Sequence, residues 1–377
     1  MPSPLSKLSR RDFLDISGRF GLTSTLLAAT GLGAGLTAST LARAADQEQQ
    51  KRYKTATKFQ LRFGASGFNE RNLDIQKSGQ LFFARDLEER TNGAIRVEFM
   101  GSNEVCNQLD CVGKTQQGIV DIYSASTQNS SGSAPYLNVL DFAYMFPTVA
   151  SMFHFFYHKK SEQLLREPLR QRHNLQFLFT HCDLRGIMLG LKWQDKPLVT
   201  SIDDLKGTKN RVTGTQMGRI AMEQLGLNPV PVAWEETLDG LRQGLLDGAE
   251  TWMSAVAYAG MAPVVSQAVD LRFFAGTEHT GMSLPKFDSL GSELQDQVME
   301  SAYCAQIFTQ GMNEAGRSRA EQMCSPEFNP DPWEQWRERL NKWSGGLDIY
   351  QEIHDVAREI PRDVAAVNVK PQRWWRG

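Results

Sequence analysis

Residues 201–250 decide the fold, and they read SIDDLKGTKNRV, TGTQMGRIAMEQLGLNPVPV and AWEETLDGLRQGLLDGAE in direct succession. Ser201 followed by Asp204 is a capping-box pattern, which predicts a short helical turn. The next segment, Lys209–Val212, is long enough only for a strand. That strand carries Arg211, whose side chain is charged at every accessible pH.

The rest of this stretch alternates helix and strand signals. Residues 215–225 have apolar side chains at helical spacing, and a glycine ends the helix. The prolines in residues 229–232 predict an edge strand, because proline cannot donate a ladder hydrogen bond. Leu238, Leu241 and Leu245 predict the next helix. This alternation predicts an open α/β sheet, in which ligands bind at the carboxyl ends of the strands.

A short pattern that occurs twice in the sequence predicts a second unit of the same build. Residues 117–121 and 243–247 share the pattern Gln-Gly-apolar-apolar-Asp, with a helix expected before and a strand after. A match of this length can arise by chance, but the alternation around it also recurs. Further strands are predicted at residues 59–63, 95–99, 120–124 and 175–179, a helix at 73–91, and mostly helix from about residue 290. The chain is therefore expected to form two lobes.

The N-terminus predicts export from the cytoplasm. Residues 9–14 read SRRDFL, which matches the twin-arginine pattern except that Asp15 replaces the usual lysine. The uncharged residues 20–42 are long enough to span a membrane, but their glycines and hydroxyl groups favour a removed signal peptide over an anchor. No later segment is apolar enough to span a bilayer. We expect a twin-arginine signal peptide at residues 1–44, cleaved near Ala44, and a periplasmic protein.

Charge and length narrow the classes of partner. Residues 1–44 hold five Lys/Arg and two Asp/Glu, so the remaining 333 residues carry 36 basic and 41 acidic side chains. A net charge near −5 argues against nucleic acid and anionic lipid as partners. A chain of this length exceeds one ordinary hydrophobic core, which again favours two lobes.

Three sequence elements carry a resemblance to a known family. They are DLKGxKxRV at 204–212, LGxNPVP at 225–231 and QGxxDGxE at 243–250. Together they resemble the solute-binding proteins of TRAP transporters, the DctP family, over about Phe59 to Gln297. The resemblance implies periplasmic receptors that capture organic acids and deliver them to a membrane permease.

The resemblance also implies a fold. It is the two-lobed periplasmic binding protein fold of the α/β class, in which each lobe is an open mixed sheet flanked by helices. A hinge joins the lobes, and the C-terminal region is helical. We expect lobe I at residues 57–186 with about 275–320, and lobe II at 187–274 with about 321–377.

Arg211 is the main candidate for ligand binding. A guanidinium presents a planar fork that holds a carboxylate with two parallel hydrogen bonds. Spacing alone favours a surface arginine that pairs with Glu223 or Asp204. The resemblance reverses this order, because in the family an arginine at this strand position anchors the carboxylate of the ligand.

Further candidate contacts follow the predicted strands. The resemblance places the loop after the first strand at the cleft, which makes Phe68 and Asn69 candidates. The others are Glu104, Ser126, Gln128, Glu250, Thr251 and Trp252. Ordinary loop polarity explains such residues equally well. Many family members carry Asn-Pro where Thr251-Trp252 stands, which predicts a reshaped pocket or, for Trp252, a packing role.

The family's second arginine is missing from this chain. Members that bind sugar acids often carry it in the strand before the turn at Lys196-Pro197, and none stands there. Lys192 and Arg185 are the candidates to replace its charge. The expected ligand is a small organic acid, which leaves a monocarboxylate, a sugar acid or a dicarboxylate open, and the expected partners are the TRAP permease membrane subunits.

An enzyme is the alternative, because twin-arginine export often serves cofactor-bearing enzymes. The sequence contains no nucleophile elbow, haem attachment site, zinc-protease motif, phosphate loop or dinucleotide fingerprint. We therefore expect a receptor without a cofactor, and keep an exported hydrolase or isomerase acting on a small organic acid as the alternative.

Histidine and cysteine spacing raise two further questions. His154 and His158 are four residues apart and can face one metal ion, but no third ligand stands nearby in the sequence, so no metal site is expected. Cys106–Cys111 and Cys304–Cys324 are candidate disulfides in an oxidising compartment. Sequence cannot supply the Cα separation that decides either pairing.

Overall fold

The computed structural model describes residues 53, 55–65, 78–255, 261–321, 324–325 and 347–376. The chain forms two compact units, one of residues 1–59 with 88–96 and one of residues 60–87 with 97–377. Every side chain of the candidate site lies in the second unit. The predicted signal peptide with its cleavage near Ala44, and the candidates Phe68 and Asn69, lie outside the described residues.

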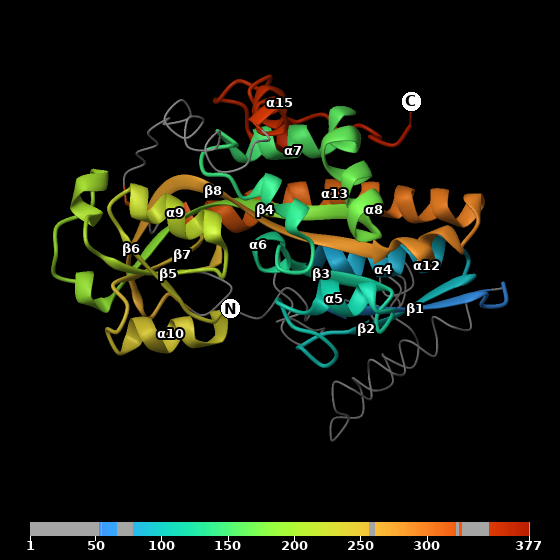
Figure 1. Ribbon diagram of the computed structural model, residues 1–377, viewed down its shortest axis with the longest axis horizontal. Helices are drawn as coiled ribbons and strands as arrows, with labels where there is room; N and C mark the ends of the chain where they lie inside the picture. The colour runs from blue at the N-terminus through green and yellow to red at the C-terminus, as the bar shows by residue number, and fades with distance from the viewer. Residues whose placement is uncertain are drawn as a thin grey trace, which may run out of the picture. The chain divides into compact units, whose positions relative to one another are not determined.

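A single mixed sheet of nine strands carries the site (Figure 1). Its order is β2–β1–β3–β8–β4–β7–β5–β6, with β9 beside β8. The strands are β1 Phe59–Ala65, β2 Ile95–Met100, β3 Ile122–Ser126, β4 Leu175–Gly190, β5 Lys209–Val212, β6 Asn228–Pro231, β7 Gly248–Trp252, β8 Val265–Ser283 and β9 Cys324–Ser325. The pairs β1–β3, β5–β6 and β5–β7 are parallel. The long strands β4 and β8 pair antiparallel and join these parallel regions.

Helices lie on both sides of the sheet, as Figure 1 shows for α9 and α10 beside β5 and β7. The α-helices are α4 Ser78–Arg90, α5 Cys111–Gln116, α6 Thr127–Ser130, α7 Val149–Tyr157, α8 Glu167–His173, α9 Gln216–Gln224, α10 Trp234–Arg242, α12 Leu284–Asp288, α13 Ser292–Glu321 and α15 Leu347–Ala357. Short 3-10 turns include η2 Pro135–Leu140, η4 Leu191–Trp193 and η5 Ile202–Leu205. Within the described part of the chain, no helix combines the length and the apolar character needed to cross a bilayer.

The stretch from residue 201 folds as its sequence predicts. The side chain of Ser201 and the carboxylate of Asp204 form a capping box at the start of η5. Strand β5 has the predicted limits, and β6 lies at the edge of the sheet, where its prolines leave no ladder bond unmade. The hydroxyl of Thr215 accepts hydrogen bonds from the amides of Met217 and Gly218 and so begins α9.

The repeated Gln-Gly-apolar-apolar-Asp pattern marks the same helix-to-strand turn twice. Gly118 follows α5 with φ +75°, and Gly244 follows α10 with φ +70°. Both angles lie in the left-handed region that a glycine adopts without a steric penalty. The predicted end of both helices at these glycines is confirmed. Leu245 was expected on the helix but lies beyond it and is 66% exposed, because Gly244 has already turned the chain.

The aspartates of the pattern also have one shared task. The Asp121 carboxylate accepts the backbone N–H of Arg62 at 2.8 Å, and the Asp121 N–H donates to the Arg62 carbonyl at 2.9 Å. Asp247 makes the same pair with Lys209, at 2.9 Å and 2.8 Å. Each aspartate therefore fixes the start of one strand against the neighbouring parallel strand, which explains why the sequence repeats it.

The strand predicted at residues 175–179 is much longer than expected. Strand β4 continues to Gly190, and all 16 of its residues are buried. A strand that is covered on both faces has no alternation of polar and apolar residues to mark where it ends. The sequence-based prediction therefore ended this strand too early.

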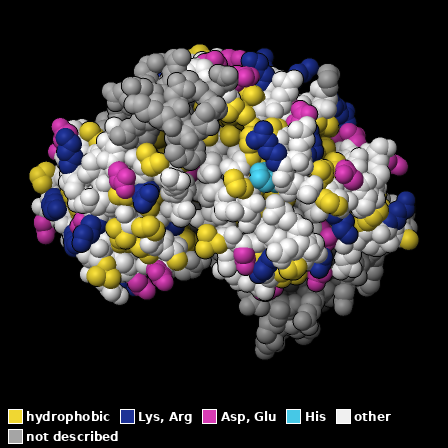
Figure 2. Space-filling model, in the orientation of Figure 1, with side chains coloured by type: hydrophobic (Ala, Val, Ile, Leu, Met, Phe, Trp, Pro, Cys, Tyr) yellow, Lys and Arg dark blue, Asp and Glu magenta, His cyan; other side chains and the backbone are white. Residues whose placement is uncertain are grey.

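On the molecular surface, acidic and basic side chains are interspersed over the face that Figure 2 presents.

Candidate functional site

Two adjoining cavities open at the ends of the strands. The outer cavity measures about 490 Å³. Its walls are Asn103, Asn107, Gln108, Leu109, Asn129, Arg211, Gly214, Pro231, Val232, Ala233 and Trp234. These residues come from the ends of β5 and β6 and from the segments that follow β2, β3, β5 and β6, as the position of binding sites at strand ends predicts.

The inner cavity is smaller and more strongly charged. It measures about 60 Å³ and is lined by Gln108, Ser126, Asn129, Arg185, Arg211, Thr213, Trp234, Thr251, Trp252 and Glu278. Four residues border both cavities: Gln108, Asn129, Arg211 and Trp234. The two cavities therefore adjoin, and Arg211 lines both of them.

Arg211 stands at the junction of the two cavities. Its side chain is only 4% exposed. Its Nε donates to the Val232 carbonyl at 3.1 Å, and its guanidinium carbon lies 5.3 Å from the centre of the Trp234 ring. The alternative of an exposed surface arginine is therefore excluded. Asp204, one of the two partners expected for it, instead accepts the backbone amide of Ser201.

Glu250 links Arg211 to a second arginine. The Arg185 Nη1 donates to the Glu250 carboxylate at 2.7 Å, while the Arg211 Nη1 lies 3.8 Å from the other carboxylate oxygen. Arg185 also donates to the Gln128 side chain at 2.8 Å. The carboxylate holds two buried cations close together, which offsets the cost of burying them.

The network continues to a second buried carboxylate. Gln128 donates to Asp141 at 2.9 Å, and the Thr215 hydroxyl donates to the other oxygen of the same group. Burial raises the pKa of Asp141 to about 7, although the hydrogen bonds from Thr215 and Gln128 and the charge of Arg185 act in the opposite direction. Asp141 therefore changes its charge near neutral pH.

Glu278 on β8 is a further charged residue that lines the inner cavity. The carboxylate of Glu278 accepts the Ser124 hydroxyl at 3.2 Å and lies 3.7 Å from His181 Nε2. The ring of His181 packs edge-on against Trp252, with 5.1 Å between the ring centres. Gly276 leaves the space that Trp252 occupies, because a Cβ at this position would overlap the indole nitrogen.

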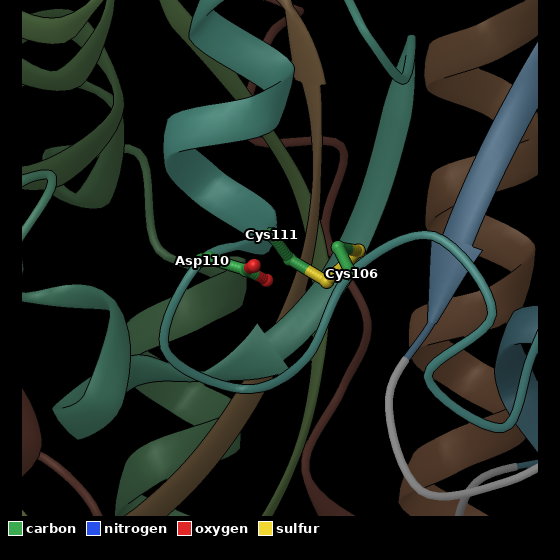
Figure 3. Close-up of side chains that lie close together, drawn as sticks. All are labelled: Cys106, Asp110 and Cys111. Atoms are coloured by element: carbon green, nitrogen blue, oxygen red, sulfur yellow. A yellow bond between two sulfur atoms is a disulfide. The ribbon is translucent and has the colours of Figure 1, made fainter.

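A disulfide fixes the loop that forms one wall of the outer cavity. Cys106 and Cys111 are joined, with a Cα separation of 4.8 Å, as Figure 3 shows. Between them, the backbone N–H of Asn107 donates to the Asp110 carboxylate at 2.6 Å. Of the two candidate disulfides that the sequence leaves open, the first is formed. The side chain of Cys324 lies outside the described side chains, so the second pair stays a candidate.

The structure brings together most of the candidates from the sequence. Ser126, Arg185, Arg211, Thr251 and Trp252 border the cavities. Gln128 and Glu250 lie directly behind the arginines, as their hydrogen bonds to Arg185 show.

Two candidates lie elsewhere. The sequence predicts Lys192 in the strand before the Lys196-Pro197 turn, but this residue lies in the turn η4. Its ammonium group pairs with Asp247 at 3.4 Å, and its side chain is 46% exposed. Glu104 is an exposed loop residue. Neither borders the two cavities that the described residues form.

Sequence reasoning missed Gln108, Asn129 and Trp234, which border both cavities. Trp234 begins α10 directly after the edge strand β6, and Asn129 lies just beyond β3. Both therefore follow the rule that ligands bind at strand ends. Applying that rule to the edge strand as well would have found Trp234.

Comparisons with known proteins agree with this architecture. A family model described as bacterial extracellular solute-binding protein, family 7 (DctP), matches residues 67–341. The 2,3-diketo-L-gulonate-binding periplasmic protein YiaO of Escherichia coli is 23% identical over an alignment of 323 positions, and the alignment covers 78% of this chain and 92% of that protein.

Solved structures show the same fold. The TRAP periplasmic solute-binding protein of Pseudomonas putida F1 with bound D-glucuronate has a TM-score of 0.68 and 18% identity, over 82% of this chain and 100% of that one. The sugar acid binding protein DctPAm of Advenella mimigardefordensis, in complex with galactonate, has a TM-score of 0.68 and 18% identity, over 81% and 99%. The predicted fold class is confirmed. Because the family model covers most of its length, the chain belongs to family 7 of the bacterial extracellular solute-binding proteins, the DctP family.

Proposed function

We propose that this protein is a periplasmic receptor that binds a sugar acid through Arg211 and delivers it to the membrane subunits of a TRAP permease. The observation that carries the proposal is the position of Arg211. It is a buried guanidinium at the junction of two cavities, and amide and hydroxyl side chains surround it.

The chemistry of the cavity walls supports a polyhydroxylated acid. Asn103, Asn107, Gln108 and Asn129 line the outer cavity, and every amide both donates and accepts hydrogen bonds. Sugar hydroxyl groups have the same double capacity, whereas the chain of a simple dicarboxylate does not. The flat ring of Trp234 supplies an apolar wall against which a sugar ring can pack.

Energetics require more than the arginine. A charge-assisted hydrogen-bonded pair contributes about 1.5–3 kcal/mol, while micromolar binding needs about −8 kcal/mol. The remainder must come from the amide contacts and from closure of the two lobes over the ligand. The proposed lobes have the residue boundaries that the sequence predicts. The cavities draw their walls from both parallel-strand regions of the sheet, so a ligand would contact both.

The relatives point to the same class of ligand. The proteins compared above are named for 2,3-diketo-L-gulonate or were solved with D-glucuronate or galactonate. These molecules share one carboxylate and several oxygen substituents on a short carbon chain.

Export through the twin-arginine pathway belongs to the same proposal. A paired Arg10→Lys and Arg11→Lys precursor should stay in the cytoplasm in a cell-fractionation assay.

Calorimetric titration with sugar acids tests the proposal. We expect D-glucuronate, D-galacturonate or galactonate to bind saturably at one site, and D-glucose, which lacks the carboxylate, not to bind. Chromatography of the ligand after incubation should recover it unchanged. Conversion of the acid into a product would instead favour the exported hydrolase or isomerase, and failure of all organic acids to bind would contradict the receptor assignment.

A further inference from the structure

A group of three possible metal ligands lies apart from the ligand cavities. His154 lies on α7 and His158 caps its C-terminal end one turn later, with 5.5 Å between their ring centres. The Glu359 carboxylate, just beyond α15, lies 2.8 Å from His154 Nε2 and 3.7 Å from His158 Nε2. One ligand atom from each residue lies within 4.8 Å of the others. None of the three borders the two cavities.

We propose that His154, His158 and Glu359 form a binding site for a divalent transition metal ion such as Zn²⁺. Two imidazole nitrogens and one carboxylate oxygen are a ligand set that zinc prefers, with a water molecule in the fourth position. Magnesium and calcium prefer sets made of oxygen alone. The sequence alone does not reveal this site, because Glu359 is 205 residues away from His154.

The geometry requires only small side-chain movements. Tetrahedral zinc with bonds of about 2.0–2.1 Å holds its ligand atoms roughly 3.3 Å apart. The side chains have room to close this distance, since they are exposed to 15% for His154, 24% for His158 and 48% for Glu359. The surroundings also favour a cation. His158 caps the C-terminal end of α7, where the helix dipole is negative.

The protons of the imidazole rings can be accounted for. Metal binding requires the neutral ring of His158. Its Nδ1 accepts the backbone N–H of Lys160 at 3.2 Å, so the neutral ring carries its proton on Nε2, towards Glu359. Metal binding at Nε2 moves that proton to Nδ1. The amide of Lys160, an exposed residue, then donates to water instead.

The site would fasten the C-terminal segment to the body of the protein. Glu359 follows α15, which packs against α7. An ion held by both elements must be lost when they separate, so it should stabilise the folded chain in proportion to its concentration.

Zinc titration of the whole protein, after removal of metals with a chelator, tests the site. We expect one Zn²⁺ per chain with a Kd below about 100 µM, stronger than the millimolar binding of a single weak contact, and a rise in Tm of at least about 2 °C. Mg²⁺ should do neither. The paired variant His154→Ala with His158→Ala, and the single variant Glu359→Gln, should weaken Zn²⁺ binding by at least about tenfold, since even groups behind a metal's ligands change affinity 10- to 100-fold.

His173→Gln is the matched control, because it removes a histidine outside the cluster, and it should bind Zn²⁺ as the parent protein does. Circular dichroism without metal shows whether each variant folds. Glu359→Gln provides a second, conservative variant if the histidine pair proves unstable. Absence of Zn²⁺ binding, equal binding of Mg²⁺, or unchanged Zn²⁺ affinity in folded variants would overturn the proposal.

Discussion

The hydroxyl of Thr215 donates a hydrogen bond to the carboxylate of Asp141, which lies 74 residues earlier in the chain. Thr215 caps the helix that follows the Arg211 strand, whereas Asp141 follows the turn η2. Through Gln128 and Arg185, the same carboxylate is connected to Glu250 and so to the ligand cavities. The polar groups around the proposed site therefore form one continuous network.

This network predicts a pH-dependent stability. Burial raises the pKa of Asp141 from 3.8 to about 7. Between these values the folded protein keeps a proton that the unfolded chain has lost, so the contribution of this group is complete below about pH 4 and is lost as the pH rises through 7. Asp141→Asn should remove this trend, which amounts to at most about 1.4 kcal/mol per pH unit for one proton.

Urea unfolding of both proteins from pH 5 to pH 8 checks this prediction. The difference in free energy of unfolding between the parent protein and Asp141→Asn should fall as the pH rises. Parallel pH profiles for the two proteins would show that Asp141 does not titrate in this range.

The disulfide should support both stability and binding. Removing the disulfide that closes the short Cys106–Cys111 loop lowers the free energy of unfolding by about 2 kcal/mol in the chain-entropy description. The same loop places Asn107, Gln108 and Leu109 in the wall of the outer cavity. The paired variant Cys106→Ser with Cys111→Ser should therefore unfold at lower urea concentration and bind the sugar acid more weakly. Reductant should shift the parent protein towards the variant and leave the variant unchanged. Equal affinity in both would mean that the loop needs no covalent tie.

Gly276 should be intolerant of a side chain. A Cβ would overlap the indole nitrogen of Trp252, and overpacking of this kind typically costs about 1–3 kcal/mol. Because Trp252 borders the inner cavity, Gly276→Ala should reduce both stability and ligand affinity. Gly132→Ala is the control, since a Cβ there meets nothing within 4 Å. Similar unfolding curves and affinities for the two variants would show that Trp252 can move without cost.

Local sequence signals predicted the frame of the site well. The limits of β5, the edge position of β6 and the cap at Ser201 all follow from propensities of neighbouring residues. The burial of Arg211 could not be derived in that way, because spacing alone favoured a surface ion pair. Only the resemblance to a family indicated it.

Contacts between distant segments escaped prediction. Asp141 stood out in no sequence pattern, because its partner Thr215 reaches it only through the packing of the folded chain. Lys192 was misplaced because β4 ends at Gly190, before the position counted back from the Lys-Pro turn. Glu359 completes a histidine pair that the sequence shows alone. For Asp141 and Glu359 the missing information was a tertiary contact rather than a local preference.

Arg211 carries the central claim, and its removal should weaken ligand binding without unfolding the protein. Arg211→Ala loses a charge-assisted pair of about 1.5–3 kcal/mol, which corresponds to a roughly 10- to 150-fold increase in Kd. Arg211→Lys should recover only part of this, because an ammonium group lacks the planar fork. Arg219→Ala removes an exposed arginine of α9, whose side chain is 54% exposed, and serves as the matched control.

Calorimetric titration of the four proteins with the sugar acid that binds the parent chain is the most direct measurement. The account predicts the order of affinity parent and Arg219→Ala first, Arg211→Lys next and Arg211→Ala last, with circular dichroism unchanged. A folded Arg211→Ala protein that binds the acid as tightly as the parent would contradict it.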